Sequence, residues 1–169
     1  MSGAENRVAI VTGGSRGIGL AIALLLAERG YTVCLSYVSD AAQDVVDAIA
    51  AQGGHALAVK GDVGDEADVI ALFKAADGLG RLAALVNNAG VVDVKSDVAD
   101  MSVTRLQRMM TTNVVGSFLC AREAVRRMST KRGGAGGAIV NLSSVAARLG
   151  GPGQFVDYAA SKGAIDTLT

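Results

Sequence analysis

Five short apolar runs rich in β-branched residues alternate along this chain with longer segments that are rich in alanine. Strands buried on both faces produce such continuous apolar runs, and the segments between them are long enough to cross over a parallel sheet as helices. We therefore expect an α/β fold in which helices cover both faces of a parallel sheet. The expected strands are 7–12, 32–37, 56–60, 84–87 and 138–142, and the expected helices are 17–29, 41–52, 66–79 and 103–128.

Length and composition favour one domain that binds a small ligand. A chain of 169 residues with 50% hydrophobic content can bury a sizeable core. Sixteen basic residues balance sixteen acidic ones, and no basic stripe interleaves with aromatic residues, so we expect neither nucleic acid nor an anionic membrane as a partner. The polar first residues and the lack of a long apolar run predict a cytoplasmic protein without a membrane span.

The cysteines and the single histidine predict no metal chemistry. Cys34 and Cys120 lie in apolar surroundings, without CxxC spacing or a histidine cluster, so we interpret them as buried, reduced thiols. His55 follows two glycines and is interpreted as a surface residue. The glycine-rich stretch 131–137 is interpreted as a flexible connection between a helix and a strand.

The first motif with chemical meaning is Thr12-Gly-Gly-Ser-Arg-Gly-Ile-Gly19, which follows the first expected strand and opens the first expected helix. In this position Gly13 would turn the chain, Gly17 would let the backbone approach a pyrophosphate, and Gly19 would let the helix pack on the strand. The chain has 22 glycines, so a chance pattern is the alternative. Its placement between strand and helix favours a dinucleotide site.

Tyr158 and Lys162 are four residues apart, a spacing that places a phenol and an ammonium on one face of a helix. A nearby cation stabilises a phenolate, which lets the hydroxyl exchange a proton with a substrate. The alternative is an ordinary helix surface on which a lysine extends its ammonium into water.

Taken in order along the chain, these motifs resemble those of the short-chain dehydrogenase/reductase family, in particular bacterial members near ketoacyl reductases and sugar dehydrogenases. The resemblance rests on Thr12-Gly-x-x-x-Gly-x-Gly19, Asn87-Asn-Ala-Gly90, Asn113, Ser144 and Tyr158-x-x-x-Lys162. It implies a doubly wound Rossmann-type sheet, a nicotinamide cofactor, and interconversion of a carbonyl and an alcohol on a small molecule. It also implies a homo-oligomer, either a dimer or a homotetramer.

The same resemblance implies the role of each catalytic residue. Tyr158 would donate a proton to the carbonyl oxygen, which Ser144 would orient. Lys162 would stabilise the phenolate and bind the ribose, and Asn113 would help maintain a water-linked proton path to that lysine. The alternatives are a capping hydroxyl for Ser144 and a residue that satisfies a helix irregularity for Asn113. The segment up to Tyr158 is one residue longer than in many relatives, so Ser143 stays open as the catalytic serine.

The sequence favours NADP(H) over NAD(H) as the cofactor. The second expected strand ends Leu35-Ser36-Tyr37 without the carboxylate that NAD-preferring sites use to bind ribose hydroxyls. Asp40 lies further on and is interpreted, with Gln43, as a helix cap. Arg16 can instead pair with the 2′-phosphate of NADP. The residues expected to contact the cofactor are Gly13, Ser15, Arg16, Gly17, Ile18, Gly19, Tyr37, Asp62, Val63, Asn87, Ala89, Gly90, Tyr158 and Lys162.

Within this set, Asp62 would bond the adenine edge, with Val63 packed beside it. A turn or helix-cap aspartate is the alternative for Asp62. The segment from Asn87 to Gly90 would shape the adenosine end of the cleft, and its alternative is an ordinary tight turn.

Two classes of function stay open on the sequence. One is an NADP-dependent carbonyl reductase, and the other is a catalytically inactive nucleotide-binding or assembly protein of the same fold. The intact serine, tyrosine and lysine positions favour the enzyme. The helical pattern around Tyr158 runs to Thr169 without a stop signal, so we expect the natural chain to continue into the further strands that the resemblance implies.

Overall fold

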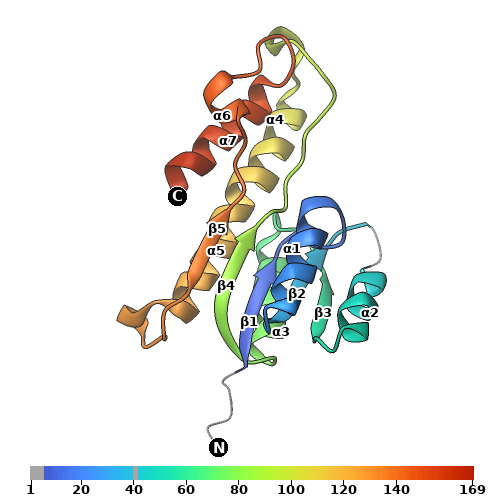
Figure 1. Ribbon diagram of the computed structural model, residues 1–169. Helices are drawn as coiled ribbons and strands as arrows, with labels where there is room; N and C mark the ends of the chain where they lie inside the picture. Colours follow the sequence, from blue (N-terminus) through green and yellow to red (C-terminus); the bar gives the residue numbers. More distant parts are fainter. Residues whose placement is uncertain (1–5, 40–41) are drawn as a thin grey trace, which may run out of the picture.

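The chain forms a five-stranded parallel sheet with the strand order β3-β2-β1-β4-β5, as the computed structural model of residues 6–39 and 42–169 shows (Figure 1). The order confirms the expected α/β fold and the doubly wound, Rossmann-type arrangement. Because the direction of winding reverses between β1 and β4, a crevice opens there at the carboxyl ends of the strands. The strands are β1 (Arg7–Val11), β2 (Thr32–Tyr37), β3 (Ala56–Lys60), β4 (Arg81–Asn87) and β5 (Ala138–Asn141).

Helices cover both faces of the sheet. Figure 1 shows α1 in front of the strands and α3 behind them, while α4 and α6 lie beyond the carboxyl ends of β4 and β5. None of the helices in residues 6–39 and 42–169 is both long and apolar enough to cross a membrane. The helices are α1 (Gly17–Glu28), α2 (Gln43–Ala51), α3 (Glu66–Asp77), α4 (Val103–Met110), α5 (Gly116–Met128), α6 (Ala146–Leu149) and α7 (Val156–Leu168).

The core has two parts because alternate side chains of each central strand face opposite sides of the sheet. The part under α3 and α5 contains Val8, Ile10, Cys34, Val63, Val69, Leu72, Phe73, Ala76, Leu82, Leu85, Cys120, Ala124 and Met128. The part under α1 and α2 contains Val11, Ala23, Val33, Leu35, Ala42, Val45, Ile49 and Val86. Both cysteines are buried and unbridged, and burial raises the pKa of each thiol to about 12. They are therefore inert packing residues.

The expected helix 103–128 is helical over its whole length, but one turn of it is not α-helical. Here α4 ends at Met110, Thr111–Val115 form a π-helical turn, and α5 begins at Gly116. The expected bounds are confirmed, and the irregularity lies at Asn113, whose side chain at the centre of the turn bonds to segments outside the helix.

Further differences of one to three residues concern element boundaries, including the ends of α1, α2 and α3. The strand β4 begins at Arg81 rather than at 84, and β1 and β5 each end one residue earlier than expected. The four-residue helix α6 is an addition to the expected elements. The helix α2 begins at Gln43 with Ala42 at its N-cap, and the interpretation of Asp40 as a cap concerns a residue outside the described ranges.

Candidate functional site

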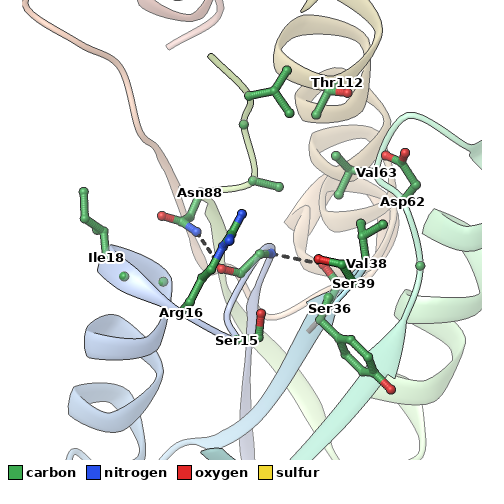
Figure 2. A pocket seen from close by; sticks show the side chains of 18 of the residues that line it. Ser15, Arg16, Ile18, Ser36, Val38, Ser39, Asp62, Val63, Asn88 and Thr112 are labelled. Carbon is green, nitrogen blue, oxygen red and sulfur yellow. Dashed lines mark hydrogen bonds between the residues drawn. The ribbon is translucent and has the colours of Figure 1, made fainter. Parts of the chain in front are cut away.

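The loop between β1 and α1 is held in place by the segment that follows β4. The Thr12 hydroxyl accepts hydrogen bonds from the backbone amides of Asn88 and Ala89, both at 3.0 Å. The Asn88 side chain donates to the carbonyl oxygens of Thr12 at 2.8 Å and of Gly13 at 3.0 Å. The Gly13 amide donates to the Ser36 hydroxyl of β2 at 3.2 Å (Figure 2). Three strands thus fix the loop at the point where the winding reverses.

Two glycines are required by this arrangement. Gly13 has a φ of +63°, a left-handed conformation that strains other residues. A methyl group on Gly19 would lie 2.3 Å from the Gly13 carbonyl oxygen and 2.5 Å from the Asn88 amide nitrogen. Because Gly19 has no side chain, these clashes do not arise, and the first turn of α1 can lie close to the loop.

A cavity of about 540 Å³ opens in front of the glycine loop, within the range of roughly 300–1,000 Å³ that is usual for ligand sites. Figure 2 shows Ile18 and Asn88 on one side, Asp62 and Val63 on the other, and Arg16 between them. The lining comprises Gly13, Ser15, Arg16, Gly17, Ile18, Gly19, Ser36, Tyr37, Val38, Ser39, Gly61, Asp62, Val63, Asn88, Ala89, Gly90, Val91, Arg108 and Thr112.

The start of α1 fits a phosphate group. Arg16 is the N-cap residue in an extended conformation, and no side chain of the described residues caps this first turn. The amides of Gly17 and Ile18 therefore lie at an uncapped helix start that also lines the cavity. Such a terminus attracts anions through its N–H groups and its dipole. The residues present suit the diphosphate of a dinucleotide.

The far wall of the cavity contains two of the residues expected to contact adenine. The Asp62 carboxylate accepts a hydrogen bond from the Gly64 amide at 2.8 Å, so one of its two oxygens stabilises a local turn. Val63 is buried beside it. Tyr37, Val38 and Ser39 continue the lining from the end of β2.

Tyr158 and Lys162 lie on one face of α7, and neither is among the residues that line the cavity. The Lys162 Nζ atom is 5.8 Å from the centre of the Tyr158 ring and donates to the Leu142 carbonyl oxygen at 2.6 Å. Burial lowers the pKa of the Lys162 ammonium because the charge is withdrawn from water. A methyl group on Gly90 would lie 3.7 Å from this Nζ and 3.3 Å from Asn113 Oδ1. Gly90 therefore borders both the cavity and the lysine.

The two candidate serines occupy the turn between β5 and α6 and make different bonds. The Ser143 hydroxyl donates to the Lys162 carbonyl oxygen at 3.2 Å, which ties the end of β5 to α7. The Ser144 hydroxyl accepts from the Ala146 amide at 3.2 Å and keeps its proton for another acceptor. The two hydroxyls thus differ in that Ser143 already donates its proton within the fold, whereas Ser144 acts there only as an acceptor.

Asn113 bridges three segments from the π-helical turn. Its Oδ1 accepts from the Val91 amide at 2.7 Å, and its Nδ2 donates to the Val91 carbonyl oxygen at 2.9 Å and to Ser161 Oγ at 3.0 Å. The Ser117 hydroxyl donates to the Asn113 carbonyl oxygen at 3.0 Å. The side chain therefore holds the cavity wall against α7.

Sequence reasoning assigned Asn87 to the cofactor, but its neighbour lines the cavity. The Asn87 side chain is buried and donates to Asn141 Oδ1 at 2.8 Å and to the Ser117 carbonyl oxygen at 3.2 Å, which braces β4 against β5 and α5. Asn88 faces the glycine loop instead. The motif contained Asn88, and the alternation of side chains along an extended segment was the signal that distinguishes the two. Arg108 and Thr112 also line the cavity, and no motif marks them.

The fold and this site define a class: a protein with a Rossmann-type sheet, a glycine loop that opens the first helix beside a cavity, and a tyrosine–lysine pair close to that cavity. The family model described as short chain dehydrogenase matches residues 7–169, and the chain belongs to this family. Members of the family are oxidoreductases that use a nicotinamide cofactor, NAD or NADP.

Named relatives agree with this assignment. The chain is 57% identical to the "Uncharacterized oxidoreductase YgfF" of Escherichia coli over 96% of its own length and 67% of the relative. It is 42% identical to the cis-4-hydroxycyclohexanecarboxylate dehydrogenase of Sinomonas cyclohexanicum, covering 96% and 64%. A crystal structure of a short chain dehydrogenase from Mycobacterium avium superposes with a TM-score of 0.90 at 36% identity, covering 98% and 63%. The chain spans about two thirds of the length of these relatives.

Proposed function

We propose that this protein is an NADP(H)-dependent carbonyl reductase or alcohol dehydrogenase that acts on a small molecule. The observation that carries the proposal is the position of Gly90, which lines the cavity in front of the glycine loop and lies beside the Lys162 ammonium. One end of a cofactor bound in the cavity would lie next to the tyrosine–lysine pair. The substrate that accepts the hydride would lie between the cofactor and this pair. Family membership supports the cofactor class.

The bound cofactor supplies the hydride, and the residues of this chain supply the proton and the orientation. Tyr158 would donate its proton to the carbonyl oxygen in reduction and accept it in oxidation. Ser144 would donate a hydrogen bond to the same oxygen. Lys162 would stabilise the phenolate and bind ribose hydroxyls, since its ammonium is fixed beside the ring. Asn113 would hold the wall at Val91 against α7.

The preference for NADP(H) is part of the proposal, and the lining at the end of β2 supports it. Among the described residues, Ser36, Tyr37, Val38 and Ser39 line the cavity there, and none of these four carries a carboxylate. Arg16 lies over the cavity between its two walls (Figure 2). A guanidinium suits a phosphate because it can form two parallel hydrogen bonds.

The chemistry is tested with Tyr158→Phe, which removes the proton and keeps the ring. Oxidation of NADPH is followed with an aliphatic ketone, a ketoacyl thioester, an ortho-quinone and an aldose. We expect wild-type turnover on at least one of them, its loss in Tyr158→Phe, and unchanged NADPH affinity. Near-normal turnover by the variant refutes Tyr158 as the acid, and NADPH binding without any wild-type turnover favours the inactive nucleotide-binding class. A larger loss in Ser143→Ala than in Ser144→Ala moves the serine assignment by one residue.

The cofactor preference is tested with Arg16→Ala and a matched control, Arg29→Ala, at the opposite end of α1. We expect Arg16→Ala to weaken NADPH binding by about 10–100-fold, the loss of one charge-assisted contact of about 1.5–3 kcal/mol, and to leave NADH binding unchanged. The control should change neither. Equal losses for both cofactors would remove Arg16 as the selector and point to Tyr37.

The dimer or tetramer implied by the family resemblance is also a proposal. Sedimentation of the purified protein decides between these states and a monomer.

A further inference from the structure

An arginine–aspartate pair lies beside the proposed catalytic tyrosine and takes no part in the function described so far. Arg105 of α4 donates from Nε to Asp157 Oδ2 at 2.7 Å and from Nη2 to Asp157 Oδ1 at 3.2 Å. The side chain of Asp157 is 0% exposed and that of Arg105 is 10% exposed. The hydrogen bonds from Arg105 hold the pKa of the Asp157 carboxyl below its usual range, so the pair is charged at neutral pH.

The pair joins three segments that meet around the site. Arg105 also donates from Nη1 to the Val94 carbonyl oxygen at 2.7 Å, in the irregular segment between β4 and α4. Asp157 Oδ1 accepts a hydrogen bond from the Tyr158 amide at 2.9 Å. A second bond nearby runs from the Ser96 amide to the Gln154 carbonyl oxygen at 3.0 Å. The wall after β4 is thereby tied to the residue that precedes Tyr158.

Tyr158 and Lys162 are anchored by different groups, although one helical turn separates them. Lys162 is held at both ends, by its Nζ on the Leu142 carbonyl oxygen and by its own carbonyl oxygen, which accepts from Ser143. Tyr158 lies in the first turn of α7, where Phe155 is the N-cap and offers no side-chain hydrogen bond. Asp157 is the side chain that bonds an amide of this first turn. The position of Tyr158 relative to Lys162 therefore depends on Asp157 and on its partner Arg105.

We propose that Arg105 and Asp157 are positioning residues, which set where the Tyr158 phenol lies relative to Lys162 and the cavity. The inference rests on the proposed function, since the proposed function assigns the proton transfer to Tyr158. An uncharged acceptor would suffice to cap the turn, whereas the arginine fork fixes both carboxylate oxygens and so fixes the direction of the aspartate. The pair acts through Tyr158 and touches neither the proton nor the hydride.

The position of the phenol can be measured without a substrate, because the chain contains three tyrosines and no tryptophan. Protein labelled with 3-fluorotyrosine should give three ¹⁹F signals, and the one missing in Tyr158→Phe belongs to Tyr158. We expect Arg105→Lys and Asp157→Asn to shift or broaden this signal and to leave those of Tyr31 and Tyr37 in place. Arg127→Lys is the matched control, since Arg127 makes the same two-pronged bond to Asp77 at 2.7 and 2.8 Å. It should change none of the three.

A double variant separates positioning from stability. Removing one partner leaves a buried charge without its counterion, whereas Arg105→Met/Asp157→Asn removes both charges and should restore much of the melting temperature. We expect the Tyr158 signal of the double variant to stay displaced. A Tyr158 signal at its wild-type position in Asp157→Asn and in the double variant would overturn the inference.

Turnover distinguishes the inference from the proposed function. With the carbonyl compound that wild type reduces fastest, Arg105→Lys should lower kcat by about 10–100-fold, as expected for a misplacement near 1 Å. Its NADPH affinity should stay within about twofold of wild type. In the Tyr158→Phe background the same substitution should cause no further loss, because both act through one group. Full turnover by Tyr158→Phe would overturn the proposed function and the inference together, while an inactive Tyr158→Phe beside a fully active Arg105→Lys would overturn the inference alone.

Discussion

Replacing Asn113 by alanine should destabilise the fold and the cofactor site together. The side chain is 1% exposed, and its removal leaves the amide and the carbonyl oxygen of Val91 without the partners they have at 2.7 and 2.9 Å. Ser161 loses one bond but keeps another, since its hydroxyl donates to the Tyr158 carbonyl oxygen at 2.7 Å. The cost therefore comes chiefly from two backbone groups.

The magnitude follows from those two groups. A buried donor or acceptor left unpaired costs about 1–3 kcal/mol, and Val91 is only partly buried, so about 2–4 kcal/mol is expected for the pair. For a chain of 169 residues each kcal/mol lowers Tm by roughly 2–4 °C, so Asn113→Ala should melt about 4–16 °C below wild type. Because Val91 lines the cavity, NADPH binding should weaken as well.

Thermal melts and urea titrations of the purified variants measure this cost. Thr111→Ala is the control, because Thr111 lies in the same π-helical turn and is exposed, so its loss should stay within about 0.5 kcal/mol. A Tm of Asn113→Ala within about 1 °C of wild type, together with abolished turnover, would refute the bridging argument and leave Asn113 a purely chemical role.

Three further predictions concern stability. Gly116→Ala should destabilise the protein by about 1–3 kcal/mol, since the added methyl group would lie 2.7 Å from Val63 Cγ2. Gly163→Ala, where the added methyl group would meet nothing within 4 Å, should stabilise α7 by about 0.5–1 kcal/mol. Urea titrations of both variants and wild type measure these changes. Lys162→Met should raise the stability of the cofactor-free protein, because burial lowers the pKa of this lysine; the gain is complete below the lowered pKa and disappears above about pH 10.4, which urea titrations at several pH values can measure. Burial alone would raise the pKa of Glu123, but its arginine partners lower it, so wild type should lose stability as the pH falls below about 4, and Glu123→Gln should lose less; a gain in stability on acidification contradicts this.

The parts of the fold that follow from local patterns could be predicted. The bounds of β2 and β3 are those expected, because a continuous apolar run ended by polar or glycine residues defines a buried strand. The spacing of Tyr158 and Lys162 likewise needs only one helix, and α7 provides it. Fold class and loop placement follow from the same local signals.

The parts that depend on distant contacts could not be predicted. The π-helical turn exists because Asn113 meets Val91 and Ser161, which are 22 and 48 residues away along the chain. Arg105 and Asp157 are 52 residues apart, and neither belongs to a recognisable motif. No periodicity reports such pairs, since a polar residue in a helix usually indicates the solvent face. The choice between Ser143 and Ser144 also depends on the direction of each hydroxyl group, which the hydrogen bonds of the turn determine.

The glycine loop and the segment after β4, which border the cavity from two sides, are held in place by different kinds of contact. The glycine loop rests on strands whose apolar residues pack on both faces of the sheet. The segment after β4 is tied by polar contacts instead: Val91 to Asn113 by two hydrogen bonds, Asp93 to Arg108, Val94 to Arg105, and Ser96 to the Gln154 carbonyl oxygen. Segments held by few apolar contacts open at lower free energy than the core does. Amide hydrogen exchange should therefore be faster at 91–101 than in β1 and β4, and bound NADPH should slow it at Val91, the residue of this segment that lines the cavity. Equal protection of this segment and of the central strands, with or without cofactor, would show that the wall is part of the rigid core and that the polar ties are redundant.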